Sequence, residues 1–429
     1  MMKKPNRLLN LSVLLILILA IGCSASPSIN VNEKNRGTVS NPTKVTFWNI
    51  NTNDKRQKHW EESIQRFNES QSRIQIVPYF YEIEAYKNKL SVAMMSGKLP
   101  DIFYYWSGEP FKYMVDSQIV ADLTEWLEND PELSSRFYRG ALHSAQYYDR
   151  IYGIPISLNK VMLWYNKELF AKYKLKPPAT WDELLHAVAV LREQQVEPIA
   201  ISGKERWPLL HWFAYLSNRI GGASPFERAA KGADNFTERS FVEAALLFRE
   251  LIDRKAFMTG FLGLDIAAAE EAFIEGDAAM YLQGDWATEK LLRNPAIGYL
   301  PFPSIQQAKQ YNDYYGGYSV GWAIARNKNQ EASFEVLMHM LSMPEQTLYV
   351  EQTGSPSSLQ QLEVDPTHMN AAVYEYIKAA NETPKTYFRF YDQDLDDSRS
   401  QLLLDAIMKI AGSEQITEEE IIHLLQQIE

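Results

Sequence analysis

The sequence contains one cysteine, Cys23, among 429 residues. A single thiol excludes a disulfide within the chain and any zinc site that needs two or more cysteines. Histidine is nearly as scarce, with seven residues, and none of them forms an HExxH pair or another metal-ligand spacing. The chain also lacks a Walker A loop and a GxGxxG motif. We therefore expect no metal site, no cofactor and no nucleotide chemistry.

Basic residues are outnumbered, with 43 Lys and Arg against 54 Asp and Glu. The first 22 residues contain Lys3, Lys4 and Arg7 but no acid, so the rest of the chain has a net charge of −14. Phosphate contacts need clustered Lys and Arg, which makes nucleic acid an unsuitable partner. A hydrophobic fraction of 46% with 23% charged residues is globular usage. The length allows two or three domains of ordinary size.

Only one long apolar run occurs, from Leu8 to Ile21, interrupted by Asn10 and Ser12. With the basic residues before it, this run predicts a secretory signal peptide at 1–22. It is shorter than the roughly 20 apolar residues of a membrane span. Residues 23–42 are polar and rich in Ser, Asn and Pro, a composition that cannot form a core. We expect this segment to be a flexible tether.

The sole cysteine follows directly on this apolar run, after Ala20, Ile21 and Gly22. The pattern resembles a bacterial lipobox, in which the cysteine thiol receives a diacylglycerol. Acyl chains of the palmitate type, buried in a bilayer, would hold the protein at the outer face of the cell membrane. The alternative is an ordinary secreted protein whose cysteine is incidental. Either reading places the protein outside the cytoplasm.

Strand-like and helix-like segments alternate from residue 45 onward. The expected elements are a strand at 45–50, a helix with Trp60, Ile64 and Phe67 on one face, a strand at 73–81, a helix at 86–97 and a strand at 101–106. Asn53 or Asp54 could cap the first helix. This β-α-β-α-β order predicts a parallel sheet with helices on both faces. Ligands of such sheets bind beyond the carboxyl ends of the strands, here 49–53 and 105–109.

A second alternation begins after Ile154 and Pro155. Capping boxes at 180–183 and 417–420 predict the starts of two helices. The other expected elements are strands at 161–166, 198–202, 278–286 and 321–327 and an amphipathic helix at 240–257. The pattern as a whole predicts an α/β protein with two domains.

One motif points to an enzyme. Residues 317–321 match G-x-S-x-G, the nucleophile elbow of α/β-hydrolases, and Asp365 or Asp392 and then His423 follow Ser319 in the required order. The elbow needs an apolar strand before the serine and a helix after it, whereas a polar segment precedes Ser319 and a strand-like one follows. This disfavours the esterase hypothesis. A glycosidase carboxylate pair stays open, because it depends on a separation in space.

Aromatic side chains are abundant, and several tryptophans lie near strand ends or in loops: Trp48, Trp106, Trp207 and Trp286. A single tryptophan is more often a core residue than a binding residue. An indole face nevertheless suits the C–H face of a sugar, and polar neighbours can bond the hydroxyls. Such neighbours are Asn49, Asn51, Asn53, Glu109, Asn159, Asp285 and Arg389. Acids and amides without a metal or nucleophile favour recognition over reaction.

Several segments appear in a familiar order: VTFWN, AMMSGKLPDIFYYW, YGIPISLNKVMLWYNKELF, PATWDEL, FIEGDAAMYLQGDW, IGYLPFPS, GGYSVGWAIA and PEQTLYVEQTGSPS. In this order the chain resembles the extracellular solute-binding proteins of family 1, the carbohydrate-binding lipoproteins of ABC importers, from about Thr43 to the end. It is most similar to the Gram-positive sugar binders. No single segment is specific to the family, but their order and spacing along the chain together support the resemblance.

The resemblance implies a two-lobed fold of the type II periplasmic binding proteins, with hinged lobes and a ligand cleft between them. It places the first lobe at 43–155, with 316–353 returning to it, and the second lobe at 156–315 together with 354–429. The crossings between lobes would lie near Pro155 to Asn159, near Gly316 and near Gly354. The G-x-S-x-G match then becomes part of a strand that returns at the hinge.

The same resemblance assigns site residues. Trp106 and Glu109 fall where family members place a stacking aromatic and a hydroxyl-binding acid, and Trp286 matches an aromatic platform of the second lobe. Asn159 stands where some members use a carboxylate, so the sugar identity of those members does not transfer directly. The remaining expected substrate-binding residues are Asn51, Trp207, Tyr318 and Arg389.

The implied function is binding without chemistry. A sugar or oligosaccharide would be captured by hinge closure and delivered by a monomer to a permease with two membrane subunits, powered by a cytoplasmic ATPase. Three alternatives stay open. They are the same fold binding another polar solute such as a polyol phosphate or a polyamine, a secreted hydrolase using Ser319 or a carboxylate pair, and a sensor subunit that presents ligand to a signalling kinase.

Overall fold

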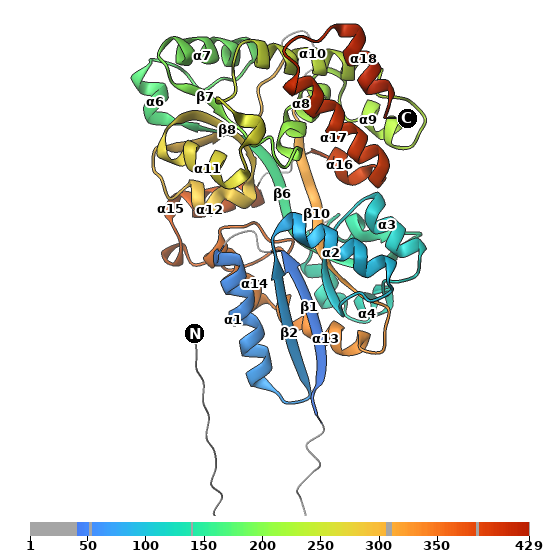
Figure 1. Ribbon diagram of the computed structural model, residues 1–429. Coiled ribbons are helices and arrows are strands. Elements are labelled where there is room, and N and C mark those ends of the chain that lie inside the picture. Colours follow the sequence, from blue (N-terminus) through green and yellow to red (C-terminus); the bar gives the residue numbers. More distant parts are fainter. Residues whose placement is uncertain (1–40, 51–53, 139, 306–310, 383–385, 429) are drawn as a thin grey trace, which may run out of the picture. The chain divides into compact units, whose positions relative to one another are not determined.

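The computed structural model describes residues 41–50, 54–138, 140–305, 311–382 and 386–428, and Pro42–Glu429 forms one compact unit (Figure 1). The predicted signal peptide and lipobox cysteine, Cys23, and nearly all of the predicted tether lie outside the described residues. Within these ranges, no helix is both long and apolar enough to cross a bilayer.

The strands agree in position with most of the expected ones. They are β1 (Thr43–Ile50), β2 (Ile74–Tyr81), β3 (Ile102–Trp106), β4 (Gln146–Tyr147), β5 (Arg150–Ile151), β6 (Gly153–Asn166), β7 (Glu197–Ala200), β8 (Ala278–Gly284), β9 (Ile297–Leu300), β10 (Tyr314–Ile324) and β11 (Tyr387–Phe388). The expected strand at 278–286 ends at Gly284, and a 3₁₀ turn follows it. The expected strand at 321–327 begins earlier, at Tyr314, because the polar segment before Ser319 is paired on its backbone with β6 and β11.

The helices cover the sheet. They are α1 (Asp54–Ser70), α2 (Ile83–Met95), α3 (Glu109–Asp116), α4 (Thr124–Glu128), α5 (Pro131–Arg136), α6 (Lys167–Lys172), α7 (Trp181–Glu193), α8 (Trp207–Gly221), α9 (Ser224–Ala230), α10 (Arg239–Asp253), α11 (Ile266–Glu275), α12 (Thr288–Leu291), α13 (Gln330–Met340), α14 (Met343–Thr353), α15 (Ala371–Glu382), α16 (Tyr391–Asp394), α17 (Asp397–Gly412) and α18 (Glu418–Gln426). Short 3₁₀ turns are η1 (Leu142–Ala145), η2 (Phe261–Gly263), η3 (Asp285–Ala287) and η4 (Pro366–His368). Both predicted capping boxes are confirmed: the side chains of Thr180 and Thr417 each accept from the backbone N–H three residues later, at the start of α7 and α18.

A mixed sheet of nine strands, in the order β2-β1-β3-β10-β6-β8-β7, organises the described residues, with β11 beside β10 and β9 beside β6. The first three strands are parallel, which confirms the predicted β-α-β-α-β unit. Beyond that unit the sheet is mixed, because β10 runs antiparallel to both β3 and β6. β10 follows β6, β8 and β9 in the chain and returns between β3 and β6, so no crossover helix joins it to a parallel neighbour.

Strands β6 and β10 lie side by side and link the elements around β8 to those around β1 (Figure 1). The first half of β6 pairs with β10, and its second half pairs with β8 and β9. At Gly316 the two backbones approach so closely that a Cβ would lie 2.1 Å from the Asn159 carbonyl oxygen. The φ of +149° at Gly316 adds a second reason why only glycine suits this position.

Two clusters of buried apolar side chains form the core. One contains Phe47, Trp60 and Trp322, from β1, α1 and β10. The other contains Trp212 and Phe248, from α8 and α10, together with side chains of α17. The first cluster continues into residues 162–297, so apolar packing is continuous along the sheet.

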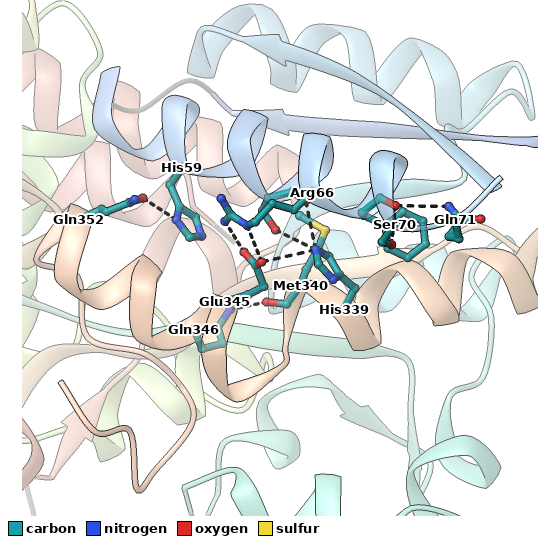
Figure 2. A network of polar contacts seen from close by, with 11 residues as sticks. His59, Arg66, Ser70, Gln71, His339, Met340, Glu345, Gln346 and Gln352 are labelled. Carbon is teal, nitrogen blue, oxygen red and sulfur yellow. Dashed lines mark hydrogen bonds and ion pairs between the residues drawn. The ribbon is translucent and has the colours of Figure 1, made fainter. Parts of the chain in front are cut away.

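Polar contacts fasten α14 to α1 (Figure 2). The Arg66 guanidinium donates two hydrogen bonds to the Glu345 carboxylate, at 2.8 and 2.6 Å. His59 Nδ1 lies 2.8 Å from Gln352 Oε1, and burial lowers the pKa of this imidazole to about 4. Because α14 ends just before Gly354, these contacts anchor the segment that leads into residues 354–359.

Candidate functional site

A pocket of about 240 Å³ lies between the middle of β10, the residue after β3, residues 140–144 and the segment 387–394. Tyr318 and Arg389, two of the predicted binding residues, line it. Its other walls include Ser319, Tyr387 and Gln393. Segments far apart in the sequence therefore converge on one concave site.

The local sequence explains how these walls meet. β11 pairs with the start of β10 and carries the segment 387–394 to the site. The backbone N–H of Ser107, after β3, donates to the Ser319 carbonyl oxygen at 2.8 Å. A Cβ at Gly108 would lie 2.0 Å from the Gln393 carbonyl oxygen, so glycine lets the start of α3 touch this segment.

Two buried polar atoms at the pocket have no hydrogen-bond partner among the described residues: Ser319 Oγ and Gln393 Oε1. Leaving such a group unsatisfied costs about 1–3 kcal/mol. A hydroxyl of a ligand can donate to the amide oxygen and can exchange a hydrogen bond with the serine. The pocket is therefore chemically suited to a molecule rich in hydroxyl groups.

Ser319 does not have the geometry of a hydrolase nucleophile. It lies inside β10 rather than at a sharp turn between a strand and a helix. Its Oγ makes no hydrogen bond to a histidine or to any other residue in the part of the chain that the structure describes, although His143 lines the same pocket. The G-x-S-x-G match is thus a strand segment, as the resemblance implied.

One ion pair sits at the pocket edge, where Arg389 Nη1 lies 3.2 Å from Asp394 Oδ1. The Asp394 charge raises the pKa of the guanidinium, so Arg389 stays cationic. Burial raises the pKa of the Asp394 carboxyl, and Arg389 partly offsets this effect. With 72% of its side chain exposed, Arg389 is accessible to a ligand.

An aromatic cluster adjoins the pocket through Phe390, which also lines it. The predicted pair Trp207 and Trp286 comes together here, with ring centroids 6.1 Å apart at 68°. His211 lies 5.1 Å from Trp207 and 6.2 Å from Trp286. Burial lowers the pKa of His211 to about 3, so it is neutral at physiological pH. Gly284 makes room for the Trp286 ring, since a Cβ there would lie 2.1 Å from it.

A buried acid precedes Trp286. The Asp285 carboxylate accepts from the Lys160 backbone N–H at 3.1 Å and from the Tyr376 hydroxyl at 2.9 Å. Burial raises the pKa of Asp285 to about 6, although the charges of Lys160 and Arg56 oppose the shift. Its contacts hold η3, and hence Trp286, against β6.

The structure disperses the other predicted site residues. Trp106 ends β3, and its ring packs edge to face on Tyr104 and Tyr86. Glu109 is exposed at the first turn of α3, and neither residue lines the pocket. Asn159 is 8% exposed and accepts a hydrogen bond from Ser157, so its side chain is engaged inside the fold. Asn51 lies outside the described residues.

Sequence reasoning did not identify Ser319 and Gln393 as unpartnered polar groups at the pocket, and it missed the contacts of Asp285 beneath Trp286. The segment 387–394, YFRFYDQD, mixes aromatic and polar residues, but no local feature of it marks Gln393. Among the described residues, no group of three His, Cys, Asp or Glu side chains could hold a metal ion.

Three comparisons relate the chain to known proteins. The family model described as "Bacterial extracellular solute-binding protein" matches residues 52–347. An ABC transporter extracellular-binding protein of Pyrococcus horikoshii is 26% identical over 205 residues, which are 47% of this chain and 45% of that protein. The melibiose/raffinose/stachyose-binding protein of Bacillus subtilis is 21% identical over 382 residues, which are 86% of this chain and 84% of that protein.

Among solved structures, one from work on xylan utilization by the thermophilic bacterium Caldanaerobius polysaccharolyticus superposes with a TM-score of 0.83. It is 26% identical, and the match covers 90% of this chain and 99% of that one. The chain therefore has the two-lobed α/β fold of solute-binding proteins, as the resemblance implied.

Proposed function

Because the chain belongs to the bacterial extracellular solute-binding proteins, we propose that it captures a sugar or oligosaccharide between two lobes and delivers it to an ABC importer. The pocket beside β10 carries this proposal. It combines two unpartnered buried polar atoms with an accessible Arg389 and a neighbouring aromatic cluster. Hydroxyl-binding groups next to aromatic faces are what a sugar requires.

The proposed lobes are 43–155 with 316–353, and 156–315 with 354–429. Three segments that would cross between them lie side by side in support of this division. β6 pairs with β10 through residues 153–160, and Ser157 bridges to Ser357. Ser358 Oγ donates to the Pro155 carbonyl oxygen at 2.6 Å. A bundle of crossing strands of this kind can act as the hinge of a closing cleft.

In the proposed closed state, Trp286 and Trp207 offer ring faces to the sugar, while Ser319, Gln393 and Arg389 bond its hydroxyls. Tyr318 adds a phenol whose pKa is raised by burial, so it stays a protonated donor. Ser319 lies within β10 rather than at an elbow, which favours binding without turnover over the Ser319 hydrolase alternative. Trp106, Glu109, Asn51 and Asn159 stay predicted contacts at the cleft.

The proposed place of action is the outer face of the cell membrane, with the Cys23 thiol lipidated and the chain a monomer. The lipid would keep the binder near its permease, which a cytoplasmic ATPase would power. Phosphorylated polyols and polyamines are the alternative ligands. The proposed site favours a neutral solute over a polyamine, because the Arg389 cation at its edge is already paired with the Asp394 carboxylate.

The test titrates the soluble body, from Ser24 onward, with melibiose, raffinose, stachyose and xylo-oligosaccharides while tryptophan fluorescence is recorded. A saturable change with one sugar and no new product in the mixture is expected. Trp286→Ala should then weaken binding about thirtyfold, the typical loss for a buried interface aromatic. Trp126→Ala is the matched control, because that indole stacks on Phe334 away from the pocket. No response to any sugar would refute the sugar proposal, and a hydrolysis product would refute binding without chemistry.

A further inference from the structure

We infer that Arg56 is a positioning residue that joins the two lobes behind the ligand, so that ligand affinity depends on a side chain outside the pocket. The inference rests on the proposed function, since it assumes that Trp286 covers a ligand when the cleft closes. Arg56, Ser355 and Lys55 are not among the substrate-binding residues that the sequence predicted.

The backbone of Arg56 belongs to one proposed lobe, and its guanidinium contacts residues of the other. It lies in the first turn of α1, which packs on β2 and α14. Its Nη2 donates to the Trp286 backbone carbonyl oxygen at 3.1 Å, in the turn after β8. The same guanidinium donates to Ser355 Oγ from Nη2 at 2.6 Å and from Nε at 3.1 Å. One side chain therefore connects α1, the proposed third crossing and the backbone of the aromatic platform.

A second contact runs parallel to the first. Lys55 Nζ pairs with Glu289 Oε1, and Glu289 is held in turn by Arg293 through two hydrogen bonds at 2.7 and 2.8 Å. Burial opposes ionisation of Glu289, but the bonds from Arg293 and Lys55 outweigh it and lower the pKa of the carboxyl. Adjacent cations of α1 thus hold the segment 286–289 at two points.

These bonds join segments that the proposed division assigns to different lobes, so opening of the cleft must break them. A contact made only in the closed state shifts the population toward closure by its own free energy. It also fixes the main chain beneath the Trp286 ring at the moment the ring would meet the sugar. Arg56 contacts the Trp286 backbone and Ser355 and does not line the pocket, so its effect on affinity would act through closure.

The experiment uses the body from Ser24 onward, which has no cysteine, with spin labels on Cys introduced at two exposed positions, Glu61 of α1 and Lys231 after α9. Label distances are measured with and without the bound sugar of the panel. Arg56→Ala should weaken affinity about tenfold, the loss typical of hydrogen bonds to a charged group, and shift the distances to longer values. Lys55→Ala should act in the same direction with a smaller effect.

Arg73→Ala is the matched control, because Arg73 pairs with Glu335 of α13, which belongs to the same proposed lobe. It should leave both readouts at wild-type values. Wild-type affinity and distances in Arg56→Ala would overturn the inference. So would an equal loss in Arg73→Ala, since that would show a general structural effect.

If the wild type binds no sugar, the proposed function fails while the label distances still test Arg56. Longer distances in the ligand-free Arg56→Ala protein than in the wild type would then support the lobe-joining role, and equal distances would overturn it.

Discussion

Asp285→Asn should make the free energy of unfolding less dependent on pH. Asp285 is 1% exposed, and its pKa of about 6 lies above the ordinary value of 3.8. The folded protein therefore holds this proton more tightly than the unfolded chain does. Its contribution to stability is full below about pH 4 and is lost as pH rises through 6. The asparagine keeps an acceptor for the Lys160 N–H and carries no charge.

The magnitude follows from the shift. A change of one pKa unit corresponds to about 1.36 kcal/mol, so a shift of roughly two units is worth about 3 kcal/mol in full. About 2 kcal/mol of this is lost between pH 4 and pH 7, because the unfolded carboxyl is already partly ionised at pH 4. The pKa of about 6 already includes the effect of the Lys160 and Arg56 charges, which oppose the effect of burial.

Urea unfolding of both proteins between pH 4 and pH 7.5 measures this difference. Glu128→Gln is the control, since it removes an exposed carboxylate at the end of α4 and should change stability by less than about 0.5 kcal/mol throughout. A free-energy difference between wild type and Asp285→Asn that stays constant over this range would refute the reasoning.

Two further substitutions test the fold that holds the site. Arg66→Leu should lower the free energy of unfolding by about 2 kcal/mol in urea titrations, because Glu345 would keep a nearly buried carboxylate without its bidentate partner; an unchanged midpoint would contradict this. Gly316→Ala should lower the melting temperature more than Gly97→Ala, because both have positive φ but only the Cβ at Gly316 would strike the Asn159 carbonyl oxygen. Equal melting temperatures for the two alanine variants would show that the close approach is unimportant.

Much of the fold could be predicted because its signals are local. A capping box needs two side chains three residues apart, and both predicted boxes are present. The alternation of apolar segments likewise predicted the parallel unit β2-β1-β3. The antiparallel placement of β10 could not be predicted from such signals, because it depends on which distant strand supplies the partner backbone.

The candidate site was predicted less completely. Trp207 and Trp286 were expected from their positions near loops, and they do pack together, while Tyr318 and Arg389 do line the pocket. Gln393 has no local feature that sets it apart from other glutamines. It becomes notable only because its amide oxygen is buried without a partner beside the pocket.

The sequence by itself determined the class of protein, because composition, charge and the order of short segments are properties of the chain. Only the tertiary structure decided that Arg56 reaches the Trp286 carbonyl, 230 residues away, and that Ser319 lies within a strand rather than at an elbow. The physical reason is that hydrogen bonds and burial depend on atoms meeting within a few ångströms. The spacing of residues along the sequence does not specify which residues come into contact when they lie far apart in the chain.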